Sequence, residues 1–328
     1  MQNAITVESL SKIFQVIDSK KGFFGSIQNL FWPNLKEIAA VNNISFSVKK
    51  GQKVAFIGPN GAGKSTTIKM LTGILFPTSG RISVLDMSPS KDRNRLGYKI
   101  GCVFGQRSQL WYHLPPIDTF QLLATIYELN EVEYKRRLDE LVAIFELAPL
   151  LQKPVRQLSL GQRMRCELTA SLLHGPEILF LDEPTIGLDL NAKLEIRALL
   201  NRLSKEHGTT LFLTSHDTAD IEEIAERVLI IDKGELILDS SLINLKKQYL
   251  KKKVLTLTLE EETMSLHLPG VTLLQKRPNH VMYEVDLAKT PIEAAIQVAL
   301  KAATVKDITI EDPSMEEIIR EVYGYKSP

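Results

Sequence analysis

The chain has 328 residues, of which 44% are hydrophobic and 24% are charged, as in a soluble globular protein of about two domains. Its formal net charge of +1 excludes a strong overall field for nucleic acid or membrane. The two cysteines, Cys102 and Cys166, belong to no disulfide or zinc pattern and fit a reducing compartment. Neither a signal peptide nor an apolar run of about 20 residues is recognisable, so a role at a membrane would require another chain to span it.

Residues 20–37 are expected to be an insertion between the first strand and the next strand, "ISFSV". Five apolar residues fall on one helical face behind two lysines: Phe23, Phe24, Ile27, Leu30 and Phe31. The pattern favours a short amphipathic helix that touches a membrane surface or a partner. Packing of the same stripe against its own domain is the alternative.

A phosphate-binding loop is predicted after the apolar run Val54–Ile57, which is typical of a buried parallel strand. Gly58–Ser65 matches G-x-x-x-x-G-K-[ST], and apolar residues at helical spacing follow it. The glycines let backbone N–H groups face phosphate oxygens at a helix N-terminus. Lys64 adds a positive charge at the phosphates, and Ser65 offers a hydroxyl to Mg²⁺. An ordinary glycine-rich turn is the alternative.

Three further predicted strands end in polar side chains. These are Gln106 after "IGCVFG", Asp182 and Glu183 after "ILFL", and His216 after "TTLFLTS". Ligands of open α/β sheets bind at the carboxyl ends of the strands, so these side chains are expected beside the phosphates. Asp182 can hold Mg²⁺, Glu183 can orient or deprotonate a water, and His216 can donate to the γ-phosphate or that water. Solvated or structural roles are the alternatives, and Gln106 alone is uninformative.

The pentapeptide "LSLGQ", Leu158–Gln162, belongs to none of these strand ends. It precedes a predicted helix, so Ser159, Gly161 and the first N–H groups of that helix form a second anion-binding surface. One phosphate loop requires only one such surface. We therefore expect the second to bind the γ-phosphate held by another copy of the chain, with ATP between the two subunits.

The remaining segments predict a domain organisation. Residues 107–157 have apolar positions at helical spacing and are expected to be a helical subdomain. A hairpin is expected to turn at Lys233–Gly234, and a linker over 241–253 follows the domain of residues 1–240. Residues 254–328 predict a small α+β domain, with a ferredoxin-like order as one arrangement and a capping box at Ser314 and Glu317 in its last helix.

The phosphate loop, "LSLGQ", "LFLDEPTIGLD" and "TSHD", in this order and spacing, resemble the ATPase subunit of an ATP-binding cassette (ABC) transporter. The resemblance spans roughly residues 1–240. It implies a P-loop NTPase cassette of the α/β class, with a RecA-like parallel core, an antiparallel β subdomain and a helical insert. The C-terminal part resembles the appendage of ABC exporter ATPases. One departure is Leu160, which stands where the family has glycine; we expect activity to survive it.

The resemblance also implies roles for individual residues. The catalytic residues would be Glu183 as base, His216 as switch histidine and Gln106 of the Q-loop. The ATP site would comprise Phe14, Gly58, Asn60, Gly61, Gly63, Lys64, Ser65 and Thr66, with Phe14 on the adenine. Mg²⁺ would be held by Ser65, Gln106 and Asp182. Ser159, Gly161 and Gln162 would be the signature motif acting in trans, and Asp189 the D-loop acid.

The function implied is an ATP-hydrolysing subunit on the cytoplasmic face of the inner or plasma membrane. Its partners would be a polytopic permease and either a second copy or a second ABC ATPase; no nucleic acid is expected. "TIGLD", "LSLGQ" and the appendage favour an exporter over an importer. A soluble ABC ATPase that acts on ribosomes or DNA, and a scaffold that binds nucleotide without hydrolysis, remain as alternatives. The transported substrate is not indicated.

Overall fold

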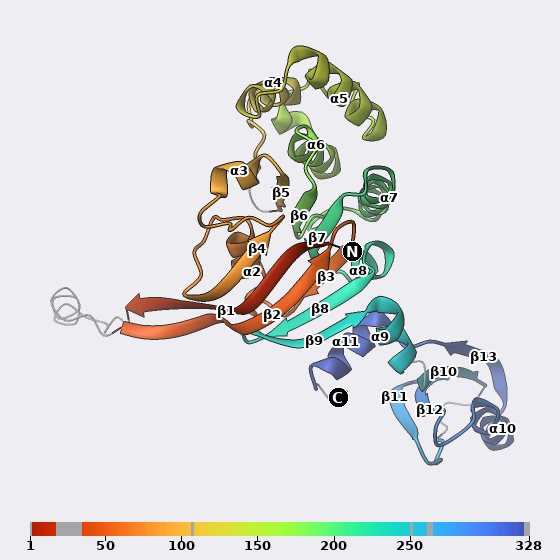
Figure 1. The fold of residues 1–328 in the computed structure, drawn as a ribbon. Coiled ribbons are helices and arrows are strands. Elements are labelled where there is room, and N and C mark those ends of the chain that lie inside the picture. Colours follow the sequence, from red (N-terminus) through yellow and green to blue (C-terminus); the bar gives the residue numbers. More distant parts are fainter. Residues whose placement is uncertain (1, 18–34, 106–107, 250–251, 261–264, 325–328) are drawn as a thin grey trace, which may run out of the picture. The chain divides into compact units, whose positions relative to one another are not determined.

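The computed structural model describes residues 2–17, 35–105, 108–249, 252–260 and 265–324. The chain forms two compact units, Met1–Asp239 and Ser240–Pro328 (Figure 1). The stretch 241–253, expected to be a linker, contains helix α9 (Leu242–Tyr249) and the start of strand β10. The assignment of residues 1–240 and 254–328 to separate domains stays a prediction. Among the described residues, no helix is both long and apolar enough to cross a membrane.

The centre of the first unit is a six-stranded sheet in the order β5-β6-β7-β3-β8-β9. Its strands are β3 (Lys53–Ile57), β5 (Ile100–Phe104), β6 (Ile178–Asp182), β7 (Thr210–Thr214), β8 (Arg227–Asp232) and β9 (Glu235–Ser241). The pairs β5–β6, β6–β7, β7–β3 and β3–β8 are parallel, so their carboxyl ends meet at one edge. Near-complete burial of β3, β6 and β7 explains their continuous apolar runs.

A second, antiparallel sheet in the order β2-β1-β4 packs beside the parallel one. It consists of β1 (Asn3–Ile17), β2 (Leu35–Lys49) and β4 (Ser79–Val84). Phe46 of β2 lies 6.0 Å from Phe56 and 6.1 Å from Phe212, between ring centroids, and so joins the two sheets in one core. This sheet is the predicted antiparallel β subdomain.

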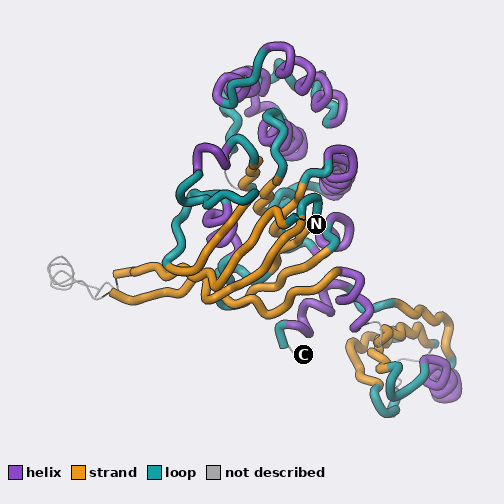
Figure 2. The backbone as a smooth tube through the Cα atoms, viewed as in Figure 1, coloured by secondary structure: helices purple, strands orange, loops and turns teal. Residues whose placement is uncertain are grey.

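Helices flank both sheets of this unit (Figures 1 and 2). They are α2 (Lys64–Leu71), α3 (Arg93–Gly97), α4 (Pro116–Ile126), α5 (Glu131–Ile144), the 3₁₀ turn Val155–Gln157, α6 (Leu160–Leu172), α7 (Leu190–His207) and α8 (Thr218–Ile224). Helices α4 and α5 and the 3₁₀ turn lie within 107–157, the segment expected to be helical. Helix α6 packs on α4 and β5, and it therefore connects this helical segment to the sheet.

The second unit contains a four-stranded antiparallel sheet in the order β11-β12-β10-β13. Its elements after α9 are β10 (Lys252–Leu259), β11 (Val271–Arg277), β12 (His280–Asp286), α10 (Ile292–Ala302), β13 (Val305–Glu311) and α11 (Met315–Val322). Leu255, Leu257 and Leu259 alternate along β10 and pack with Ala295 and Ala299 of α10. The α+β class is confirmed, and the antiparallel order β11-β12-β10-β13 is the strand order of a ferredoxin-like sheet. In the part that the structure describes, α10 is the one helix between strands of this sheet, so the helix that a ferredoxin-like fold has between its first two strands is not among the described residues.

Two local predictions have clear outcomes. The hairpin β8–β9 turns at Lys233–Gly234, both with positive φ, and the Ser314–Glu317 capping box opens α11. In contrast, residues 35–37 of the proposed amphipathic insertion belong to strand β2, where Lys36 and Glu37 pair with β1. The predicted end of the insertion at Glu37 is therefore wrong, and the apolar stripe Phe23–Phe31, which carries the predicted helix, lies outside the described residues.

Candidate nucleotide site

The phosphate loop lies between β3 and α2, where the backbone turns around its glycines. Gly61 and Gly63 have φ of 80° and 109°, a region that residues with side chains rarely adopt. A Cβ on Gly63 would lie 2.4 Å from the carbonyl oxygen of Ala40, so the site also has no space for a side chain. The loop thus has glycine where the chain must curl, as expected for a phosphate cradle.

Lys64, the first residue of α2, points back over this loop. Its Nζ donates to the carbonyl oxygens of Gly58 at 2.6 Å and Pro59 at 3.3 Å, and it lies 3.1 Å from Nε2 of His216. Burial lowers the pKa of the Lys64 amine, although the negative charges of Glu183 and Asp182 oppose this. The Lys64 amine is therefore held at the mouth of the loop by polar groups that follow β3 and β7, near the charges of Glu183 and Asp182.

Asp182, at the end of β6, faces the start of α2. Its Oδ1 accepts hydrogen bonds from Ser65 Oγ at 3.2 Å and from Thr214 Oγ1 at 2.7 Å. Hydroxyl and carboxylate oxygens are ligands that Mg²⁺ prefers, and Mg²⁺ completes its shell with waters and substrate phosphates. Ser65 and Asp182 therefore fit this ion. In the described parts of the chain there is no cluster of three or more His, Cys, Asp or Glu residues that could hold a metal by itself.

Glu183 has an unusual backbone for a non-glycine residue, with φ of 58°. Its N–H donates to both the carbonyl oxygen and Oγ1 of Thr214, each at 3.1 Å. Strain of this kind persists only where the surroundings enforce it, and it concentrates at functional sites. The backbone conformation places the carboxylate over the loop, with Oε1 3.1 Å from His216 Nε2.

The Glu183 carboxylate and the His216 imidazole form a polar pair beside Lys64. Burial raises the pKa of Glu183 above the usual carboxyl range, against the opposing charges of His216 and Lys64. A raised pKa suits a group that must accept a proton. Nε2 of His216 can either donate to Glu183 or accept from Lys64, because one ring nitrogen cannot do both. The histidine can therefore exchange partners without moving.

These groups line one cavity of about 480 Å³ at the carboxyl edge of the parallel sheet. Nine residues predicted from the sequence lie in its wall: Asn60, Gly61, Gly63, Lys64, Ser65, Thr66, Asp182, Glu183 and His216. Gly58 lies just beneath, where its carbonyl receives Lys64. Gln106 lies outside the described residues, but Phe104 and Gly105 immediately before it line the cavity.

Phe14, like Gly58, is a predicted ATP contact that does not line the cavity. It lies on β1 with 37% of its surface exposed, and the Lys12 amine lies 5.2 Å from the centroid of its ring. An aromatic ring partly covered by its own neighbour is available for stacking on one face only. Its predicted contact with adenine stays a prediction.

The sequence reasoning missed several residues of the wall, and also Thr214, which is buried behind it. Thr214 holds both Asp182 and the Glu183 backbone, and its position at the end of the β7 run was the available signal. Lys69 follows the phosphate loop by a few residues, Phe104 precedes Gln106 by two residues, and Ile186 lies within "LFLDEPTIGLD". Ala40 and Ile74 carry no local signal, because only the folded chain brings their segments to the loop.

The signature residues lie outside this cavity, at the start of α6. Ser159 Oγ accepts from the Gln162 N–H at 3.2 Å and Gln162 Oε1 accepts from the Ser159 N–H at 3.0 Å, a capping box. A Cβ on Gly161 would lie 2.8 Å from Cβ of Ala192, so this glycine allows α6 to approach α7 closely. Asp189 caps α7 by accepting from Ala192 N at 2.9 Å. The two predicted motifs therefore pack against each other within one chain.

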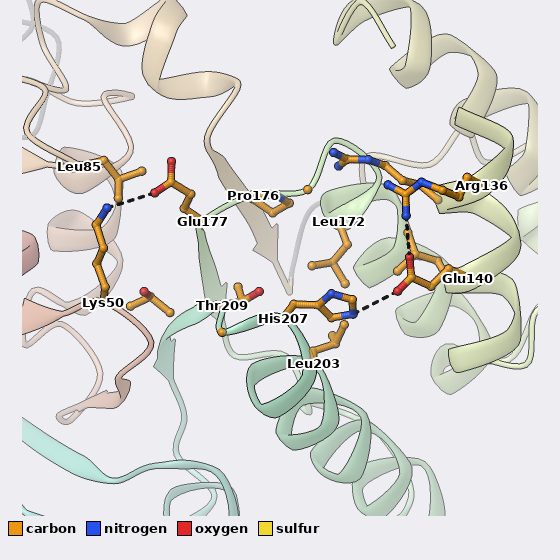
Figure 3. A pocket seen from close by; sticks show the side chains of 15 residues that line it. Lys50, Leu85, Arg136, Glu140, Leu172, Pro176, Glu177, Leu203, His207 and Thr209 are labelled. Carbon is orange, nitrogen blue, oxygen red and sulfur yellow. Dashed lines mark hydrogen bonds and ion pairs between the residues drawn. The ribbon is translucent and has the colours of Figure 1, made fainter. Parts of the chain in front are cut away.

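A second cavity, of about 410 Å³, lies near the amino ends of β6 and β7, at the opposite edge of the sheet (Figure 3). Its charged side chains neutralise one another: Lys50 lies 3.5 Å from Glu177, and Glu140 lies 3.6 Å from Arg136 and 3.5 Å from His207. None of the predicted nucleotide-binding or catalytic residues lines it. The chemistry therefore places the candidate site in the first cavity.

Comparison with known proteins agrees with the geometry. The ABC transporter family model matches residues 41–186. The chain is 34% identical over 227 residues to the bacitracin transport ATP-binding protein BcrA of Bacillus licheniformis, covering 69% of this chain and 72% of that protein. It is 29% identical to the daunorubicin resistance ATP-binding protein DrrA3 of Streptomyces coeruleorubidus, covering 87% and 91%. The dimeric ATP-binding cassette MJ0796 bound to ADP and Pi has a TM-score of 0.59 at 26% identity, covering 73% and 98%.

The glycine loop, the buried lysine and the paired acids at the carboxyl edge of a parallel sheet define a P-loop nucleotide-hydrolysing cassette. The extent and identity of the match to BcrA then fix the family. The chain belongs to the ABC transporter family and is an ATPase of that family.

Proposed function

We propose that the chain powers a membrane exporter by ATP hydrolysis, as one of two cassettes that close on ATP. The observation that carries the proposal is the convergence of Lys64, Glu183 and His216 on the rim of one phosphate loop. Relatives named for bacitracin transport and for daunorubicin and linearmycin resistance support the direction of export. The cargo is set by the membrane partner, so its chemistry does not follow from this chain.

Each residue of the cavity has a role in this proposal. The loop N–H groups and Lys64 bind the β- and γ-phosphates. Ser65 and Asp182 hold Mg²⁺, which when bound neutralises phosphate charge. Glu183 accepts the proton of the attacking water, and its raised pKa keeps it basic enough to do so. His216 orients Glu183 or the γ-phosphate, depending on which neighbour its Nε2 serves.

The second half of the site comes from a partner cassette. Ser159, Gly161 and Gln162 lie outside the cavity of their own chain, so they serve a nucleotide held by a second copy or by another ABC ATPase. In this proposal a separate polytopic permease carries the cargo, with this chain on the cytoplasmic face of the membrane, and relatives named as transport ATP-binding proteins support it. The dimeric structure of the cassette MJ0796 supports this pairing.

Glu183→Gln tests the proposal. Removal of the base should lower kcat for ATP by at least about 100-fold, while ATP affinity stays within a few-fold and the ATP-bound dimer accumulates. The measurements are phosphate release, nucleotide binding and size-exclusion chromatography with Mg²⁺-ATP. Glu177→Gln is the matched control, because Glu177 precedes the amino end of the same strand and should leave turnover unchanged.

The same variant, tagged, then serves as bait in detergent-solubilised membranes with Mg²⁺-ATP. A polytopic membrane protein at near-equal stoichiometry would support the transporter. Parent-like hydrolysis by Glu183→Gln would contradict the catalytic assignment. Recovery of ribosomal or DNA-bound proteins without a polytopic partner would replace the transporter by a soluble ABC ATPase.

A further inference from the structure

A buried carboxylate behind the cavity joins the two segments that carry Glu183 and His216. Asp220, on α8, is fully buried. Its Oδ2 accepts from the hydroxyls of both Thr185 and Ser215, the latter at 2.6 Å. Its Oδ1 accepts from Arg197 Nε at 2.6 Å, a residue of α7. One carboxylate thus collects donors from three separate stretches of the chain.

The positions of the two hydroxyls relate this cluster to the reaction. Thr185 follows Glu183 by two residues, and Ser215 directly precedes His216. Glu183 has the strained φ of 58° described above, and its own N–H is fixed by Thr214. Thr185 anchors the chain on the other side of that strained residue, so its backbone is held from both directions.

The cluster is rigid because its members are buried and mutually satisfied. Thr185 and Ser215 are each 2% exposed, and Arg197 is 3% exposed. Arg197 also lies 3.2 Å from Asp217 and 3.3 Å from Glu223, so its charge is matched from several sides. A buried polar network with every donor and acceptor paired fixes the geometry of the groups that it joins.

We propose that Asp220 is a positioning residue for ATP hydrolysis. By holding Thr185 and Ser215 on one oxygen, it sets the separation of the Glu183 carboxylate and the His216 imidazole, 3.1 Å in this structure. Asp220 is fully buried and does not line the cavity, so it would act through Thr185 and Ser215. The inference rests on the proposed function, because it assigns a reason for the placement of Glu183 and His216.

The matched pair Thr185→Val and Thr185→Ser tests it with little change in volume. Valine removes the hydroxyl that reaches Asp220, whereas serine keeps it. We expect Thr185→Val to lower kcat by about 10- to 100-fold, since small misplacements of a catalytic group have effects of this size. The KM of Thr185→Val for ATP should change less than about twofold. Thr185→Ser should retain kcat within about threefold of the parent, because serine keeps the hydroxyl that donates to Asp220.

Asp220→Asn, compared with Asp239→Asn, separates positioning from stability. Asp239 is also paired with an arginine, Arg227, at 2.6 and 2.5 Å, and neither of these two residues lines the cavity. Asp220→Asn should lower kcat as Thr185→Val does, and circular dichroism should show that the variant is still folded at the assay temperature. Asp239→Asn should leave kcat unchanged. Equal kcat values for Thr185→Val and Thr185→Ser would overturn the proposal, as would a loss confined to KM. If Glu183→Gln abolishes hydrolysis but Thr185→Val and Asp220→Asn retain it, the positioning role of Asp220 is wrong and the proposed function stands.

Discussion

At the scale of single residues, His174 is a buried imidazole with a defined protonation. It stacks on Tyr127 with 3.8 Å between ring centroids, and its Nε2 donates to the carbonyl oxygen of Ile100 at 3.0 Å. Its buried Nδ1 has no hydrogen-bond partner among the described residues. Burial, helped by the charge of Arg137, lowers the pKa of His174 to about 4. The ring is therefore neutral in the folded protein at neutral pH.

This histidine should make the protein less stable in mild acid. The unfolded chain protonates His174 near pH 6.5 and the folded chain only near 4, so the unfolded state binds more protons in that window. The contribution of neutral His174 to the free energy of unfolding is intact above pH 6.5 and is lost progressively as the pH falls to 4. At about 1.4 kcal/mol per pKa unit, the loss reaches roughly 3 kcal/mol. Denaturant unfolding of the parent and His174→Gln between pH 4.5 and 7.5 measures this difference. If the free energy of unfolding depends on pH in the same way for both proteins, this prediction is wrong.

Much of the site could be predicted residue by residue. Lys64, Asp182, Glu183 and His216 were recognisable because strand, loop and helix signals adjoin them in the sequence. Thr185 and Asp220 were not, because a hydroxyl or carboxylate on a short polar stretch gives no sign of its distant partner. Their role depends on a contact across 35 residues, which only the fold supplies.

At the scale of elements, the start of α6 combines a helix cap with an anion-binding surface. The capping bonds use Oγ of Ser159 and Oε1 of Gln162 as acceptors. The Ser159 hydroxyl proton and the Gln162 amide protons are still donors, and an incoming phosphate can receive them without disrupting the cap. The Leu160 side chain lies against Gly187, where a Cβ would come within 3.2 Å of it, and 46% of its surface is exposed.

Ser159→Asp separates the two roles of this residue. Aspartate caps helices as well as serine does, so the free energy of unfolding should stay within about 0.5 kcal/mol of the parent. A carboxylate facing a phosphate should nevertheless prevent ATP-driven dimerisation and lower turnover at least about tenfold. Thermal unfolding, chromatography with ATP and phosphate release provide the readouts. Ser159→Ala is the comparison, since it should lose about 1 kcal/mol of cap energy as well. Parent-like turnover by Ser159→Asp would show that the residue does not face phosphate.

The hairpin β1–β2 shows where element prediction failed. Its strands run for 15 residues each, and Phe14, Gln15 and Val16 pair with Ile38, Glu37 and Lys36. The stretch before Ile38 was assigned to a helical insertion, because helical spacing of aromatic residues preceded it. Strand ends with mixed polar and apolar residues give a weak sequence signal even in long strands, so long-range pairing determined the boundary.

At the scale of the whole molecule, each unit has its own hydrophobic core. The first is built around Phe56, Phe180 and Phe212, and the second around β10, β12 and α10. The change in composition after residue 240 was visible in the sequence. The strand order of the parallel sheet was not, because β3 pairs with strands more than 150 residues later in the chain.

A chain that ends after Ser241, with β9 complete, should therefore fold and bind ATP. Its nucleotide affinity should equal that of the full chain within about threefold, since every described residue of the cavity is retained. Calorimetry and nucleotide binding on both chains provide the test. An insoluble product, or one that no longer binds ATP, would show that the first unit depends on the second.

The position of β3 in the sheet also has a consequence for how the protein is made. Val54–Ile57 is among the most buried segments of the molecule, yet both of its neighbours, β7 and β8, are translated much later. At about 5–20 residues per second, a ribosome needs on the order of ten seconds or more to reach them. During that interval an apolar strand has emerged without its native partners, and nascent-chain chaperones have a segment to protect. The cassette can first bind nucleotide only after His216 and β8 have left the ribosome.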